Sequence, residues 1–110
     1  MKLPKPEKAY VDLAKVRDYC LNPEHPRGRH KARVFAEALG LTAKQAEELR
    51  DALLEAVRTN EAAFFEQDDF GDRYRVDFWV DRLDRRATVR SLWIVKRGED
   101  FPRFVSCYVL

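Results

Sequence analysis

The 110-residue chain has the length of one domain, and its composition excludes several classes of protein. Hydrophobic residues make up 45% of it and aromatic residues 12%, which excludes a disordered chain, and charged residues reach 36%, so the surface must be densely ionic. No apolar run is long enough to cross a membrane, the first residues lack the apolar stretch of a secretion signal, and two cysteines are too few for a disulfide framework. We therefore expect a reduced, cytoplasmic protein that needs neither metal nor cofactor.

The net charge of +2 conceals three blocks of opposite sign. Residues 1–41 carry nine Lys and Arg against five Asp and Glu, residues 42–72 carry three against nine, and residues 73–110 carry nine against five. Segregated charge affects the choice of partner more than the net value does. The two basic blocks would form one anion-facing surface if the fold joins them. A GC-rich genome or a hot habitat would explain the same arginine-rich surface without any ligand.

Three helical patterns occupy the first 60 residues. They follow residues 8–11, which we interpret as a short edge strand. Asp12 is the expected N-cap of a first helix that ends just before Pro23, because a residue preceding proline disfavours helical geometry. A second helix is predicted over residues 29–39. Residues 42–45, Thr-Ala-Lys-Gln, have the pattern of a capping box and begin the third helix.

From Glu61 onward the hydrophobic period changes from helical to alternating, which predicts strands. We expect strands over residues 62–67, 73–81, 87–96 and 102–110. The short turns between them leave only an antiparallel arrangement. The sequence thus predicts one α+β domain over residues 1–110, with three N-terminal helices packed on a C-terminal antiparallel sheet of three to four strands.

The segment 25–33 is the most basic part of the chain and holds both histidines, three arginines and a lysine. It lies at the predicted start of the second helix, where free backbone N–H groups favour an anion, and Gly28 would let the backbone approach that anion closely. We predict that phosphate or a polyanion binds here, through Arg27, Gly28, Arg29, His30 and Arg33. The alternative is that these side chains simply point into water while His25 orders the loop.

Alternation also predicts which residues face away from the core on the sheet: Arg75, Asp77, Trp79, Thr88, Arg90 and Lys96. A tryptophan between cations suits stacking of nucleic-acid bases beside neutralised phosphates, so Arg75 and Trp79 join the predicted binding residues. A partner subunit or the N-terminal segment covering Trp79 is the competing interpretation.

Two motifs resemble a known family. They are Asn-Pro-x-His-Pro-x-Gly-x-x-Lys-Ala at residues 22–32 and Val-Arg-Ser-Leu-Trp-Ile-Val at residues 89–95. Both resemble an uncharacterised bacterial family, the domain-of-unknown-function family 6883, over nearly the whole chain. Members also occur as modules of polymorphic toxins, so the resemblance implies a place in a toxin system. It bears on the fold rather than on any activity.

Three functional hypotheses follow. The first is a metal-independent, toxin-type ribonuclease in which His25 transfers protons while Lys31 and Arg90 hold the phosphate. His25 is preferred to His30 because two prolines fix its loop. The second is a non-enzymatic module that binds an acidic partner, either nucleic acid or protein, through the same surface. The third is a toxin-system accessory or immunity protein that contacts a cognate protein through its acidic third helix. Convergence of His25, Lys31 and Arg90 in one cleft would favour the first hypothesis.

Overall fold

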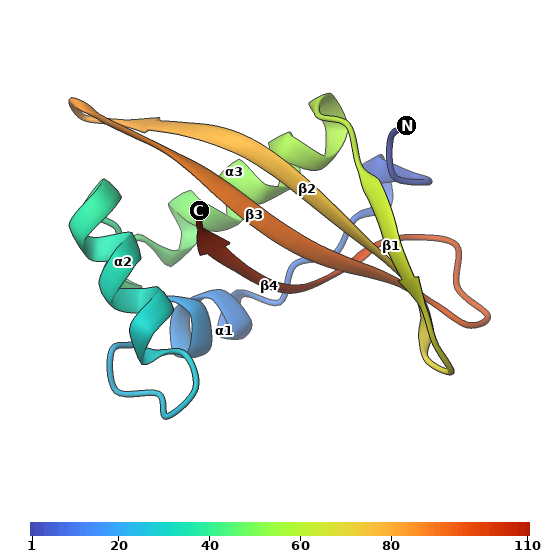
Figure 1. Cartoon of the computed structure of the whole chain (residues 1–110), viewed down its shortest axis with the longest axis horizontal. Helices are drawn as coiled ribbons and strands as arrows, with labels where there is room; N and C mark the ends of the chain where they lie inside the picture. Colours follow the sequence, from blue (N-terminus) through green and yellow to red (C-terminus); the bar gives the residue numbers. More distant parts are fainter.

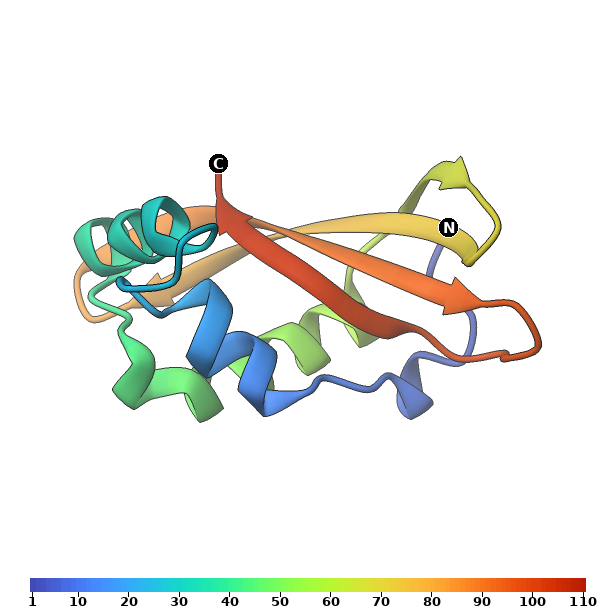
Figure 2. The ribbon, with the colours of Figure 1, turned by 90° about the horizontal axis from the view of Figure 1, so that it is seen from below.

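A four-stranded antiparallel sheet follows three helices in the computed structural model, which describes residues 1–110 (Figure 1). The elements are α1 (Leu13–Lys15), α2 (Arg29–Leu39), α3 (Ala46–Thr59), β1 (Ala63–Gln67), β2 (Gly71–Arg82), β3 (Arg85–Lys96) and β4 (Arg103–Val109). The strands lie in sequence order, β1-β2-β3-β4, and α1 and α3 cover one face of the sheet (Figure 2). The predicted α+β fold is confirmed. No helix combines the length and the apolar composition needed to cross a bilayer.

The predicted helix caps are present. Asp12 accepts a hydrogen bond from the backbone N–H of Ala14 at 2.9 Å, and the capping box forms between Thr42 and Gln45. The box begins a short 3-10 turn, Ala43–Gln45, that leads directly into α3. Both caps satisfy backbone groups that a helix start leaves without partners.

Two predictions about the N-terminal region were wrong in detail. The first helix is α-helical for three residues only, and Val16–Cys20 continue it as a π-helical turn. The wider turn brings Val16, Cys20 and Leu21 into the core together, all three less than 2% exposed. The expected edge strand at residues 8–11 is a single parallel bridge from Tyr10 to Arg103. A 3-10 turn ending at Lys8 and the helix cap at Asp12 leave no room for a longer strand.

The β2–β3 hairpin forms the centre of the sheet. Its two strands pair over twelve residues each, from Gly71 opposite Lys96 to Arg82 opposite Arg85. Alternation along both strands turns one set of side chains towards the helices. That buried set comprises Tyr74, Val76, Phe78, Val89, Ser91 and Trp93. The Trp93 indole donates to the Ser91 hydroxyl at 2.8 Å, and that hydroxyl donates to the Val76 carbonyl at 2.7 Å, so the buried polar atoms are satisfied.

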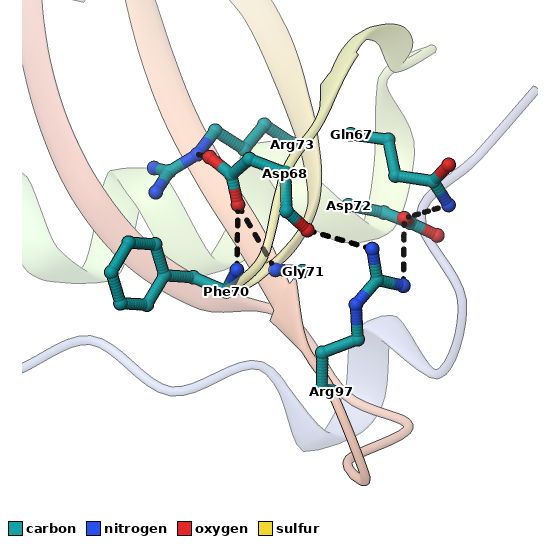
Figure 3. Close-up of polar contacts among 7 residues, drawn as sticks. All are labelled: Gln67, Asp68, Phe70, Gly71, Asp72, Arg73 and Arg97. Atoms are coloured by element: carbon teal, nitrogen blue, oxygen red, sulfur yellow. Dashed lines mark hydrogen bonds and ion pairs between the residues drawn. The ribbon is translucent and has the colours of Figure 1, made fainter.

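The β1–β2 turn is fixed by its own polar network (Figure 3). The Asp68 carboxylate accepts hydrogen bonds from the backbone N–H groups of Phe70 and Gly71 and from the Arg73 side chain, at 2.7–3.1 Å. Arg97 donates to the Asp68 carbonyl at 2.7 Å from the far side of the turn. The network therefore holds the 71% exposed Phe70 at the tip of an ordered turn.

We predict that Gly71→Ala destabilises the fold by about 2 to 4 kcal/mol, because the added Cβ would overlap the Val95 carbonyl oxygen across the strand pair. Gly98→Ala is the matched control. Its Cβ would meet no atom within 4 Å, although φ there is +80°, so only the backbone cost of about 1 kcal/mol applies. Urea unfolding of both variants measures the difference. Equal losses would show that close strand approach is not what requires glycine at position 71.

Candidate anion-binding site

His25 orders the loop that precedes α2. Its Nδ1 accepts hydrogen bonds from the backbone N–H groups of Arg27 and Gly28, at 3.0 and 3.1 Å. The ring also meets the Tyr19 ring edge-on, with 4.8 Å between centroids. Because Nδ1 is an acceptor, the neutral imidazole carries its proton on Nε2. Only Nε2 is left for a ligand. The two contacts of Nδ1 are those expected if His25 orders the loop, which was the alternative to a role in anion binding.

Gly28 has a packing reason for lacking a side chain. It is buried, and a Cβ at this position would overlap the carbonyl oxygen of Tyr19. The close approach thus joins the helical turn before the loop to the start of α2. Glycine is required here by the protein's own backbone, independently of any anion.

Lys31 is the centre of the candidate site. Its ammonium donates to the Tyr19 hydroxyl at 3.2 Å and to the Ser106 hydroxyl at 3.3 Å, and it lies 5.6 Å from the centre of the Tyr108 ring. The side chain is half-buried and makes no ion pair with a carboxylate. A half-buried cation held only by neutral hydroxyls and ring faces keeps most of its charge available to an anion.

Arg90, in contrast, is already paired. Its guanidinium makes two hydrogen bonds of 2.9 Å to the Asp77 carboxylate, directly opposite on β2. This hydrogen bonding lowers the pKa of Asp77 from its ordinary value and raises the pKa of Arg90. Tyr108 faces Arg90 from β4 on the other side. The bidentate pair leaves Arg90 less available for a phosphate than a free arginine would be.

The structure brings together two of the three predicted catalytic residues. Lys31 and Arg90 both adjoin Tyr108, and a shallow depression beside it is lined by His30, Lys31, Val34, Tyr108 and Val109. His25 contacts the ring of Tyr19, whose hydroxyl binds Lys31, but no hydrogen bond joins His25 to Lys31 or Arg90. Of the three residues only Lys31 lines this depression, and neither His25 nor Arg90 does.

The remaining predicted binding residues divide into two groups. Arg27, Arg29 and Arg33 are exposed and make no ion pair, whereas eight arginines elsewhere in the chain each pair with an acid. On the sheet, Arg75 is exposed without a partner. Trp79 is 67% exposed, so no segment of the chain covers it, and its ring lies beneath the guanidinium of Arg86 at 5.6 Å.

Sequence reasoning missed Tyr19, Ser106 and Tyr108, which hold Lys31 in place. Two buried thiols, Cys20 and Cys107, lie behind them. A hydrogen bond with Cys107 lowers the pKa of Cys20 to about 7, while burial raises that of Cys107. No three His, Cys, Asp or Glu side chains are grouped so that they could hold a metal ion.

The Asp77–Arg90 pair generates a pH prediction. The pKa of Asp77 is lower in the folded state than in the unfolded state, where it is about 3.9. The ionised carboxylate therefore contributes fully to the free energy of unfolding above about pH 3.9, and this contribution is lost as the pH falls through the folded-state pKa. Asp77→Asn removes this contribution. We expect the variant's unfolding free energy to decline less between pH 6 and 2.5 than the parent's, by up to about 1 kcal/mol for so exposed a pair.

Asp84→Asn, in the β2–β3 turn, is the control, since Asp84 makes no ion pair. Its pH dependence should follow that of the parent chain in urea titrations. A parallel decline in all three proteins would mean that the cross-strand pair contributes no pH-dependent stability.

Comparison with known proteins places this fold among relatives. A chain of a structure described as a contact-dependent growth inhibition toxin–immunity protein complex from Klebsiella pneumoniae 342 is similar to it, with a TM-score of 0.71 and 13% sequence identity. The similarity covers 91% of this chain and 98% of that one, and at such low identity it shows a shared fold. No curated protein matches the sequence. The model of DUF6883, a domain of unknown function, matches residues 2–110, and the chain therefore belongs to the DUF6883 family.

Proposed function

We propose that this chain is a non-catalytic, protein-binding module of a toxin–immunity type of system, and that its basic segment, residues 27–33, contacts an acidic surface of a cognate protein. The observation that carries the proposal is the absence of ion pairs in this segment. Arg27, Arg29, Lys31 and Arg33 have no carboxylate partner, although eight arginines elsewhere are paired.

The free chain holds these cations at an electrostatic disadvantage. Arg29, Lys31 and Arg33 lie in the first turns of α2 and Arg27 lies in the loop just before it, where the helix dipole is positive and no acidic residue offsets it. Arg29 and Arg33 are also four residues apart, a spacing at which like charges on a helix repel each other. Each effect costs a few tenths of a kcal/mol to about 1 kcal/mol. A partner that supplies carboxylates at this place would remove the cost on binding.

The open face of the sheet favours a protein over RNA as the partner. Proteins that bind single-stranded RNA combine stacking aromatics with a positively charged groove. Here four of the arginines on β2, β3 and β4 are balanced by acids, namely Arg73, Arg86, Arg90 and Arg103. Trp79 thus lies beside the balanced Asp77–Arg90 and Asp81–Arg86 pairs, although Arg75 on the same strand is unpaired. A patch of this kind, part apolar and part charge-balanced, resembles the surface of a protein–protein interface.

The structural likeness to a chain of a toxin–immunity protein complex supports the same class of function. That similar chain belongs to an assembly of two proteins, and this chain shares its fold over most of its length. A cognate protein partner is therefore the simplest assignment for the basic segment.

The proposal predicts that Arg29→Gln combined with Arg33→Gln weakens partner binding at least tenfold, and more at low salt than at high salt. The probes are the purified products of the genes that flank this one, titrated against the full chain by calorimetry. Arg17→Gln combined with Arg50→Gln is the matched control, because it removes the same charge from arginines already paired with Asp18 and Asp51. Loss of affinity of equal size in both double variants would contradict a specific role for the basic segment.

A metal-independent ribonuclease is the second candidate, and the free charge of Lys31 beside Tyr108 favours it. In that reaction Lys31 would neutralise the phosphate, with Arg90 behind Tyr108. Nε2 of His25, the nitrogen that its loop leaves open, would transfer the proton. Arg90 would first have to give up part of its pairing with Asp77.

Incubation of the purified protein with total RNA, with and without EDTA, tests the second candidate. A ribonuclease of this kind would cleave RNA in the presence of EDTA, and Lys31→Met would lower its cleavage rate at least a hundredfold. The cleavage rate would change with pH as a histidine titrates near neutral pH. Absence of cleavage between pH 5 and 9 would exclude it and leave the binding function.

A further inference from the structure

Half of β2 has no neighbouring strand on one side. β3 pairs with β2 along its whole length to Arg82, but β1 pairs only with residues 72–75. Figure 1 shows the β2–β3 hairpin continuing well beyond the end of β1, with α3 beside it. We call residues 76–82 on this side the free edge of β2. An unpaired edge presents backbone groups that another strand can bind.

The orientation of the backbone along the free edge follows from one hydrogen bond. The Asn60 side chain donates to the Asp77 carbonyl at 3.3 Å from the α3 side, so this carbonyl points away from β3. Residues two apart on a strand direct their N–H and C=O groups to the same side. Trp79 and Asp81 therefore direct theirs to the free edge as well, beyond the reach of β1.

A groove runs between this edge and α3. It has a volume of about 430 Å³ and is lined by Ala52, Glu55, Ala56, Thr59, Asn60 and residues 78–81. Alanines on the helix side keep the groove open, because longer side chains there would cover the strand edge. Phe78, Trp79 and Val80 supply an apolar wall, and the indole of Trp79 is largely exposed at the rim.

The charge of the groove is acidic. Glu55 lies in it without an ion pair, and Asp81, which pairs with Arg86, lies opposite. The adjoining surface of α3 adds the unpaired carboxylate of Glu47, whereas Glu48 and Asp51 pair with Arg82 and Arg50. We propose that an extended, basic segment of a partner protein binds in this groove and joins the sheet as a strand along the free edge of β2. Backbone hydrogen bonds would supply affinity, and its lysines or arginines would meet Glu55 and Asp81.

A second copy of this chain fits the groove less well. In a symmetric pair of free edges, each copy would bring Asp77 and Asp81 towards the other, both already paired with Arg90 and Arg86, and no unpaired cation would meet Glu55. Like charges across a strand pair are destabilising. This site is separate from the basic segment of the proposed function and has the opposite charge, so each can fail without the other.

The test uses the full chain labelled with ¹⁵N and a cyclised β-hairpin peptide whose outer strand reads Lys-Val-Lys-Val-Lys. Cyclisation reduces the ordering cost that a short linear strand would incur. We expect the peptide to shift the amide resonances of Trp79 and Asp81 and to slow their hydrogen exchange at least tenfold. The same hairpin with N-methylated amides on its outer strand keeps the charges but cannot form the strand hydrogen bonds, and it should not bind.

Two protein variants separate the groove from general attraction to an acidic helix. Glu55→Lys should weaken hairpin binding at least fivefold, whereas Glu47→Lys, with the same charge change on the same helix outside the groove, should change it less than twofold. Both side chains are exposed, so neither change disturbs the core. Equal weakening by the two variants, binding of the N-methylated hairpin, or no binding at millimolar peptide would overturn the proposal. So would a dimer of the free chain in sedimentation that the hairpin dissociates, because it would assign the edge to a second copy.

Discussion

The register of the β2–β3 hairpin is the constraint on which the rest of the structure depends. Twelve consecutive residue pairs fix which side chains face the helices and which face away. Trp93 and Val76 enter the core because of this register, and Asp77 lies opposite Arg90 for the same reason. A register slip of one residue would exchange the two faces of the strand, so that arginines would be buried and Trp93 would be exposed. The core and the ion pairs of the open face therefore enforce the same register from opposite sides of the sheet.

How far the sequence predicts this arrangement depends on the range of the interaction. Asp12 as a helix cap and the Thr42–Gln45 capping box involve residues a few positions apart, and both are present. The alternation of β2 and β3 also predicts the buried face correctly. The Asp77–Arg90 pair was within reach as well. If residues 83 and 84 alone form the turn, Arg82 pairs with Arg85, and each earlier residue of β2 pairs with the next residue of β3.

Other features lay outside what local patterns can supply. Lys31 meets Ser106, a residue of the last strand, only because α2 packs beside β4, and no periodicity links two positions so far apart. The π-helical turn at Val16–Cys20 has the same origin, because the core needs three buried residues at positions that a regular helix would not align. Tertiary packing overrides local preference in both cases. Lys31 could thus be predicted as a site residue from the sequence, but the residues that contact it could be identified only from the structure.

The single parallel bridge between Tyr10 and Arg103 has a consequence for the order of folding. Tyr10 donates to the Pro102 carbonyl and accepts from the Phe104 N–H, both at 2.9 Å, so this part of the N-terminal segment is held by residues near the end of the chain. Met1 is held from the middle of the chain, because its carbonyl accepts from the Ala62 N–H. Contacts of such long sequence separation close late, because a long loop must first lose its entropy. During synthesis on the ribosome, the N-terminal segment and the helical turn that follows it have to wait for β4. Until β4 emerges, the apolar face of the nascent sheet stays partly exposed, and chaperones would be needed to keep it from aggregating.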